Sequence, residues 1–411
     1  MSLTHTTPYV PDTAIISREI EEPKSGYNVS IGYLRVFVTL LVLAHHAMLA
    51  YCPFAPPPAP SLTAQPRWWQ AFPVVDAQTW NGFSALVGFN DTFFMSLMFF
   101  ISGLFVWKSL QRKGTGHFLR DRTLRLGLPF LASAAIIAPL AYYPAYLQMG
   151  QHGVGNFWKQ WISLGIWPAG PAWFVWLLLA FDCVAAGLFM APNWAEIAGC
   201  FFSKASRRPS AFVGFLIGIS AAVYIPLAMR FNPISWTQFG PLSFQTSRIL
   251  HYLVYFLIGV TLGGHGIERG ILAQGGKLAR RWWLWSTAAI VVFGIASNVF
   301  IAASTTRATS PSWQALADFF FTVTCAITSV AGLAVFVRFV RKSSRIADSL
   351  RDNAYGMYLI HYAFVSWMQY ALLRTHLSGF AKGTIVFLSV VVLSWVTTSA
   401  LRRIPFVSRV L

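Results

Sequence analysis

The sequence predicts an all-α polytopic membrane protein with about ten transmembrane helices. Hydrophobic residues make up 56% of the 411 residues and charged residues only 11%, whereas soluble domains carry about 25% charged residues. The 17 tryptophans and 14 tyrosines suit the aromatic belts found at both membrane interfaces. Ten apolar runs are long enough to cross about 30 Å of hydrocarbon.

The ten runs follow one another along residues 31–411, which we expect to form one membrane domain after a polar tail of residues 1–30. Two connections are longer than the rest. Residues 52–85 are rich in proline and expected to be irregular, and residues 147–172 are aromatic and expected to lie along the interface or dip into it. The spans are expected at residues 33–51, 86–107, 126–146, 173–191, 211–229, 250–267, 283–303, 315–337, 354–373 and 384–401.

The basic residues indicate how the helices are oriented. With the N-terminus inside, 24 of the 31 lysines and arginines fall on the cytoplasmic side and 7 on the other side. An excess of lysine and arginine is typical of the cytoplasmic loops of membrane proteins. It predicts that both termini and the loop 108–125 face the cytoplasm. We expect no secretory signal before the first span, because the first 30 residues are polar.

The net charge of +18 does not indicate a nucleic-acid partner, because the cations lie in short loops between apolar runs. The four cysteines have no paired spacing, so neither a disulfide framework nor a zinc site is indicated. We therefore expect no bound metal.

The first span, "LRVFVTLLVLAHHAMLAY", contains one cation and two histidines. An ionisable residue inside a bilayer is costly and is by default a functional candidate. Arg35 and His46 are 11 residues apart, which places them on one helix face about 16 Å apart along the axis, whereas His45 points about 80° away. Neutral imidazole suits general base catalysis near pH 7. The structural alternative is that Arg35 snorkels to the interface while His46 hydrogen-bonds a neighbouring helix.

Two further stretches carry candidate residues. In "FLRDRTLRLGLPFL", Arg120, Arg122 and Arg125 belong to the densest basic cluster on the predicted cytoplasmic side, and the alternative is ordinary topogenic charge. In "MSLMFFISGLF", Ser102 and Gly103 could allow close approach of another helix.

Five stretches occur in an order that resembles a known family: "YLRVFVTLLVLAHHA", "MSLMFFISG", "RTLRLGLPF", "AWFVWLL" and "YGMYLIHYAFV". Together they resemble the integral-membrane acyltransferase family 3 over residues 31–411. The most specific element of the family is an arginine followed 11 residues later by a histidine. It falls on Arg35 and His46 and excludes His45.

The family's Arg-x-x-Arg ahead of a proline falls on Arg122, Arg125 and Pro129. Within the family, "RTLRLGLP" in a short chain most resembles the periplasmic-glucan succinyltransferase branch. No internal repeat of the kind found in many transporters is evident.

The resemblance implies an enzyme that moves an acyl group, acetyl or succinyl, from cytoplasmic acyl-CoA to a hydroxyl of an extracytoplasmic carbohydrate such as a glucan or polysaccharide. His46 would act as general base or form an acyl-histidine intermediate, and Arg35 would hold the donor or polarise the thioester carbonyl. The arginines of the basic cluster suit the phosphates of the donor.

The resemblance also implies partners and a location. We expect acyl-CoA as donor co-substrate and no permanently bound cofactor. The expected partners are membrane lipids, acyl-CoA and the carbohydrate acceptor, with no nucleic acid, and a homo-oligomer is left open. The expected location is a bacterial-type inner (cytoplasmic) membrane, crossed several times.

Four polar residues in or beside the spans rank lower. His361 is expected in the inner half of the ninth span, as part of the substrate site or as a structural histidine. Asp91, at the outer mouth of the second helix, is expected to orient His46 or the acceptor, or only to start the helix. Asp182 must be paired or neutral, and neither it nor His251 is assigned a role.

A secondary transporter is the main alternative, with Arg35, His46 and Asp182 forming a substrate or proton path. Consumption of thioester by the purified protein would discriminate the two, because a transporter leaves the CoA acylated. A catalytically inactive scaffold is disfavoured by the intact Arg–His spacing.

Overall fold

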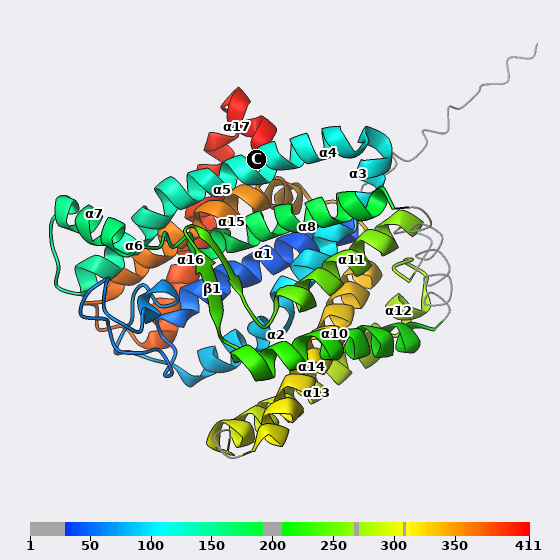
Figure 1. The fold of residues 1–411 in the computed structure, drawn as a ribbon, viewed down its shortest axis with the longest axis horizontal. Helices are drawn as coiled ribbons and strands as arrows, with labels where there is room; N and C mark the ends of the chain where they lie inside the picture. The colour runs from blue at the N-terminus through cyan, green and yellow to red at the C-terminus, as the bar shows by residue number, and fades with distance from the viewer. Residues whose placement is uncertain (1–28, 192–207, 267–270, 307–309) are drawn as a thin grey trace, which may run out of the picture.

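The computed structural model describes residues 29–191, 208–266, 271–306 and 310–411, and most of these are helical (Figure 1). The expected tail of residues 1–30 lies outside the described residues except for its last two, which begin the first helix. The longer helices are α1 (Val29–Leu49), α2 (Asn81–Gly103), α6 (Ala138–Gln148), α7 (Val154–Ser163), α8 (Trp173–Phe189), α10 (Pro209–Phe231), α11 (Ile249–His265), α13 (Trp282–Thr306), α14 (Pro311–Phe339), α15 (Arg345–Leu372) and α16 (Gly379–Leu401). The shorter ones are α3 (Val106–Lys113), α4 (Thr115–Arg122), α5 (Leu128–Ala132), α12 (Lys277–Arg280) and α17 (Pro405–Val410).

Each of the ten expected spans coincides with a helix or an uninterrupted run of helices. Among the described residues, eight such runs are long and apolar enough to cross a membrane. The other two are α11, which has only 17 residues, and α15, which has 28 residues but carries polar side chains such as His361 and Gln369. The predicted all-α polytopic class is confirmed.

The third expected span belongs to one helical run from Thr115 to Gln148. Two π-helical segments interrupt it, η2 (Thr123–Gly127) and η3 (Ser133–Ile137). A proline follows each segment by two residues, at Pro129 and Pro139. Proline lacks an N–H and clashes with the preceding turn, and single π turns are frequent at functional sites.

Helices α2 and α11 cross with their backbones in contact. A Cβ atom added to Gly103, Gly259 or Gly263 would lie 2.2, 2.1 or 1.9 Å from a carbonyl oxygen of the facing helix. Only glycine permits such an approach, and a Gly-x-x-x-Gly spacing is a common device for it between membrane helices. The close helix approach expected at Gly103 is therefore present.

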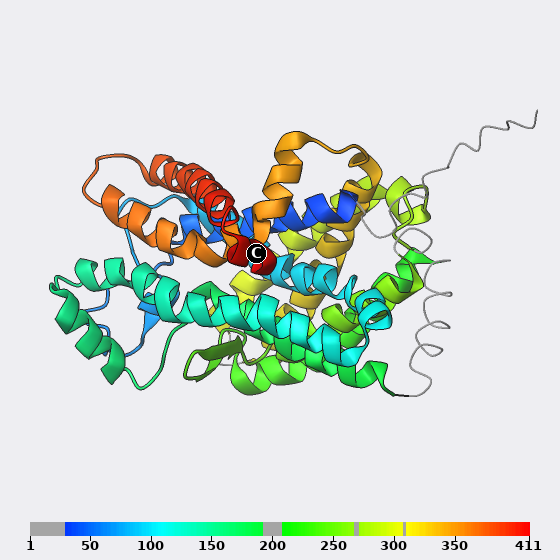
Figure 2. The same cartoon turned by 90° about the horizontal axis from the view of Figure 1, so that it is seen from above.

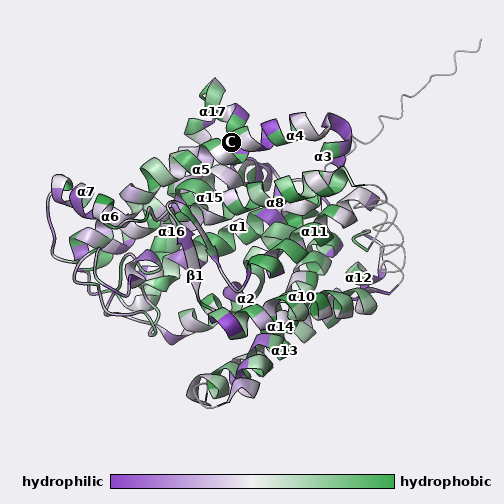
Figure 3. Ribbon diagram, viewed as in Figure 1, coloured by the Kyte–Doolittle hydropathy of each residue, from purple (hydrophilic) through white to green (hydrophobic). Residues whose placement is uncertain are grey.

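Three of the connections predicted to lie outside gather at one end of the molecule. Figures 1 and 2 both place the 52–80 connection, the turn from α6 to α7 and the turn from α15 to α16 at the left. The turn from α3 to α4 lies at the opposite end, where hydrophilic residues gather (Figure 3). This separation fits the predicted topology, while the orientation in a membrane remains a prediction.

The 52–80 connection is irregular apart from one 3-10 turn, η1 (Trp68–Gln70), and a second 3-10 turn, η4 (Gly170–Ala172), precedes α8. An antiparallel hairpin of β1 (Trp236–Phe239) and β2 (Leu242–Gln245) joins α10 to α11. This hairpin was not predicted from the sequence.

Candidate active site

The first helix, α1, carries the candidate catalytic residues through the centre of the molecule (Figure 1). Its residues Ile31, Leu34, Val38 and Val42 are fully or almost fully buried in the main hydrophobic core. The helix contains no proline and ends at Leu49, just before a proline-rich segment that cannot continue it.

His46 lies in the last turn of α1 and contacts His361 of α15. The Nδ1 of His46 is 3.0 Å from the carbonyl oxygen of Val42 and 3.2 Å from the Nε2 of His361. The Nδ1 of His361 is 2.6 Å from the carbonyl oxygen of Tyr358. The two imidazoles therefore form a chain that starts at a backbone carbonyl and ends at His46.

The contacts assign the protons of this chain. A carbonyl oxygen can only accept a hydrogen bond, so the Nδ1 of each histidine carries the proton. The Nε2 of His361 then accepts from His46, and the Nε2 of His46 carries the free lone pair. No residue in the described part of the chain hydrogen-bonds that atom. His361 is fully buried, whereas His46 is half-buried and keeps access to a substrate.

This contact corrects the expected depth of His361. Because His361 touches His46, it lies at the same depth as the end of α1 and not in the inner half. The reason is that α15 begins at Arg345, nine residues before the apolar run that marked the expected span. His361 is thus near the middle of a 28-residue helix.

An aromatic and an amide side chain of α15 contact His46. The ring of Tyr362 meets it edge to face at 5.1 Å, and Gln369 donates to its backbone carbonyl at 3.0 Å. The Tyr362 hydroxyl donates to the carbonyl of Gln70 in the 52–80 connection at 3.2 Å. The outer connection is therefore tied to the layer that contains His46.

His45 occupies a different environment, as its direction on α1 predicted. Its ring stacks on Phe94 of α2 at 5.1 Å. Its Nδ1 is buried and has no hydrogen-bond partner among the described residues. His45 is therefore a packing residue in this structure.

Arg35 lies 11 residues before His46 on α1, with an exposed side chain. By helix geometry it sits about 16 Å inward of His46 on the same face. Because α15 runs against α1 and contacts it at His361, the α15 residues at the level of Arg35 are those near its start. Tyr355, six residues and therefore about 9 Å before His361, donates to the carbonyl oxygen of Arg125 at 2.8 Å. The face of α15 that leads inward from His46 thus reaches the basic cluster.

Arg122 and Arg125 occupy different settings in that cluster. Arg122 ends α4, stands 5.2 Å from the centre of the Phe118 ring and pairs through Nε with Asp182 of α8 at 3.2 Å. Arg125 lies in the π-helical segment η2 and is exposed. Arg120 is also exposed, on the last turn of α4.

The ion pair identifies the partner that Asp182 requires. Asp182 is fully buried, and the side chain of Arg122 is 25% exposed. Removing one member of a buried pair is costly, because the remaining charge stays without compensation. A single sequence could not show this pairing, since 60 residues separate the two positions.

Neither Asp91 nor Ser102 contacts His46. Asp91 receives both terminal nitrogens of Arg248, at 2.9 and 2.6 Å, and therefore orients that arginine and not His46. The Ser102 hydroxyl donates to the carbonyl of Met98 in its own helix at 2.8 Å. The structure brings neither residue to the two histidines.

His251 is also separate from the His46 site. It is fully buried, and its ring lies 4.9 Å from Tyr255 and 5.6 Å from Phe321. Neither ring nitrogen has a hydrogen-bond partner among the described residues.

The sequence interpretation missed Tyr358, Tyr362 and Gln369, which surround the histidine pair. The only available signal was their spacing. Tyr358, His361, Tyr362, Val365 and Gln369 follow the 3–4-residue spacing of one helix face, in a span that is unusually polar.

The comparison with protein families gives one finding. A family model described as an acyltransferase domain, that of acyltransferase family 3, matches residues 28–399. No curated protein and no solved structure matches the chain significantly.

Proposed function

The chain belongs to acyltransferase family 3 and is a multi-pass membrane acyltransferase, and on this premise we propose its donor, acceptor and chemistry. It transfers an acetyl or succinyl group from cytoplasmic acyl-CoA to a hydroxyl of an extracytoplasmic carbohydrate, such as a glucan or polysaccharide. The membrane is of the bacterial inner type.

The hydrogen-bonded chain from the Tyr358 carbonyl through His361 to His46 carries this proposal. It supports a neutral His46 whose Nε2 accepts a proton. The bond from its Nδ1 to His361 would strengthen when His46 becomes positively charged. His361 is then a positioning residue, because it acts through His46.

The proposed step transfers the acyl group from the sulfur of CoA to the hydroxyl oxygen of the acceptor. The acceptor hydroxyl oxygen attacks the thioester carbonyl carbon while its proton moves to the Nε2 of His46. The C–S bond then breaks, and His46 returns the proton to the CoA thiolate. The products are an ester and free CoA, and the enzyme ends unchanged. An acyl-histidine intermediate is the variant in which the same Nε2 attacks first.

The inner end of the site supports acyl-CoA as the donor. Arg125 and Arg120 are exposed there, and Arg122 is held against α8 by Asp182. Guanidinium groups form charge-assisted, often bidentate bonds with phosphate. Arg35 lies inward of His46 on the same face of α1, where it would contact the donor.

The secondary-transporter alternative is not supported, because the family is one of acyltransferases. Asp182 also pairs with Arg122 and not with Arg35 or His46.

The test is a transfer assay with purified protein, radiolabelled acetyl-CoA or succinyl-CoA and a set of glucans. We expect release of one thiol for each label that appears on the glucan. Mass spectrometry of the CoA species that copurifies would identify the natural acyl group. Label that remains on CoA with every acceptor, in folded protein, would overturn the proposal.

A further inference from the structure

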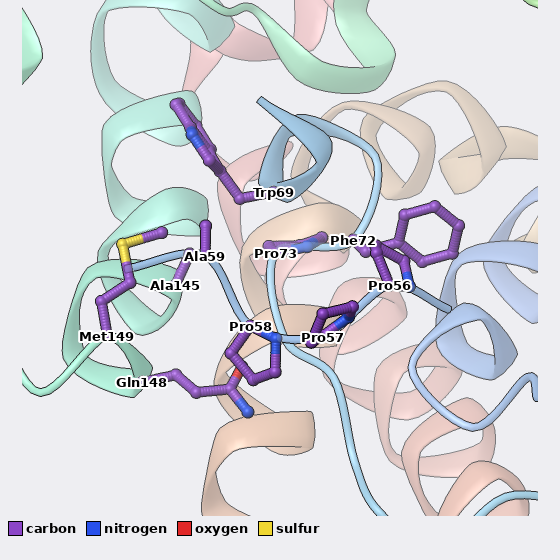
Figure 4. Close-up of a pocket in the computed structure, with 10 residues that line it drawn as sticks. All are labelled: Pro56, Pro57, Pro58, Ala59, Trp69, Phe72, Pro73, Ala145, Gln148 and Met149. Atoms are coloured by element: carbon purple, nitrogen blue, oxygen red, sulfur yellow. The ribbon is translucent and has the colours of Figure 1, made fainter. Parts of the chain in front are cut away.

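A cleft of about 800 Å³ opens at the end of the molecule that carries the 52–80 connection. Its walls include the proline run Pro56–Pro58, Gln148 at the end of α6, and the turn from α15 to α16 with Arg374 and His376. A smaller hollow, drawn in Figure 4, shares Pro56–Pro58 and Gln148 and has room for about 10 Å³, the space of one water. The larger cleft has the size that binding sites for small molecules usually have.

The wall of the cleft is fixed in place by buried polar contacts. Gln148 uses its whole amide on Val75, accepting from the backbone N–H at 3.0 Å and donating to the carbonyl at 2.6 Å. Lys382 of α16 pairs with Asp76 at 2.7 Å, and the two side chains are 1% and 3% exposed. A buried pair that spans a loop and a helix fixes one arrangement of that loop.

The cleft lies beyond the end of α1 that carries His46. Asp76, which lines it, donates its backbone N–H to the carbonyl of Ala50 at 3.0 Å, and Ala50 is one helical turn beyond His46. Leu373, which also lines it, is one turn beyond Gln369, whose amide contacts the backbone of His46. Both walls therefore begin about one turn from the proposed base.

The charge on the cleft lining that is not neutralised by an ion pair is positive. Its one acidic lining residue, Asp76, is neutralised by Lys382. Arg374 is exposed and, among the described residues, pairs with no carboxylate. The proline run adds apolar surface, of the kind that C–H faces of sugars cover.

We propose that this cleft binds the acceptor, and that the acceptor is a saccharide with an anionic substituent recognised by Arg374. This inference rests on the proposed function, because it names the class of acceptor for the His46 site. The position of the cleft allows a hydroxyl of the bound sugar to reach His46 from the side opposite the basic cluster.

The first test measures binding without the reaction. The full chain in phosphatidylcholine nanodiscs is titrated with a fluorescent oligomer of uronic acid and with a neutral gluco-oligomer of equal length. We expect tighter binding of the acidic oligomer. Arg374→Gln should weaken it about three- to fivefold at low salt, as for an exposed charge contact, and should leave the neutral oligomer unaffected. Lys159→Gln, which removes an exposed charge from α7 away from the cleft lining, is the matched control.

The outcomes separate this proposal from the function itself. Equal affinity for the two oligomers, or equal effects of Arg374→Gln and Lys159→Gln, would overturn the cleft assignment. Phosphatidylglycerol added to the nanodiscs tests whether a lipid headgroup occupies the cleft. If this lipid binds through Arg374 and the oligomer does not bind, the assignment of the cleft to a saccharide is also overturned. A failed proposed function would appear differently, as intact oligomer binding without acyl transfer to any acceptor.

Discussion

Replacing His361 by phenylalanine should slow acyl transfer, because it removes the acceptor of the His46 Nδ1–H bond. When His46 takes the hydroxyl proton, this bond becomes charge-assisted, and such bonds contribute about 1.5–3 kcal/mol. At about 1.4 kcal/mol for each factor of ten, kcat should fall about 10- to 150-fold. The loss is partial because the carbonyl of Val42 still accepts from the same nitrogen. The KM for the acyl-CoA donor should stay unchanged, since His361 contacts His46 and not the donor.

The assay follows CoA release with a thiol reagent on purified protein. Phenylalanine has a similar ring shape and suits a fully buried position, so the fold should persist. His361→Gln is the conservative variant, because its amide oxygen can accept the same bond, and it should recover part of the lost rate. Combined with His46→Ala, His361→Phe should add no further loss, since the two residues act as a unit.

Two results would refute this reasoning. One is a His361→Phe protein of parental thermal stability whose kcat lies within twofold of the parent. The other is an additive loss in the double variant. The first would show that Val42 alone orients His46 and that the histidine pair is a packing contact, and the second would show that His361 acts on the reaction independently of His46.

Four further predictions concern the donor cluster, its ion pair with Asp182, the helix packing and the topology. Arg125→Ala should weaken acyl-CoA binding, measured by calorimetry, at least about tenfold at low salt and less at high salt. Unchanged affinity would mean that Arg125 only sets the membrane topology. Arg122→Ala alone should destabilise the protein, because Asp182 remains buried and unpaired at a cost of about 3–5 kcal/mol. Adding Asp182→Asn should restore thermal stability but not donor affinity, and a stable single variant would contradict the pairing. Gly263→Val should lower thermal stability, because its Cβ would lie 1.9 Å from the carbonyl oxygen of Leu104 at the end of α2, whereas the open position of Gly88 should tolerate alanine. A reporter fused after Leu411 should be cytoplasmic, and an extracytoplasmic signal would overturn the alternation of ten spans.

The helices were predictable because each apolar run must satisfy its own backbone hydrogen bonds in lipid, so hydropathy alone locates them. The shared face of Arg35 and His46 was predictable for a similar reason, since it depends only on helix periodicity. The close approach at Gly103 also followed from a local feature, the absence of a side chain.

The partners of these residues were not predictable from one sequence. Whether His361 meets His46 depends on the register of two parallel helices, because the two residues are 315 positions apart in the sequence. The apolar pattern of α15 does not fix that register. It also misplaced the start of the helix, because the first residues of α15 are charged. The ion pairs of Asp182 with Arg122 and of Asp91 with Arg248 depend on packing in the same way.

The central claim is that His46 is the base, and a side-by-side comparison of His46→Ala with His45→Ala tests it most directly. Both proteins are purified, checked for thermal stability and assayed for transfer of label from acyl-CoA to glucan. His46→Ala should lose about 10²- to 10⁴-fold in rate, whereas His45→Ala, whose ring only stacks on Phe94, should keep most of it. A stable His46→Ala protein with activity near that of the parent would contradict the account.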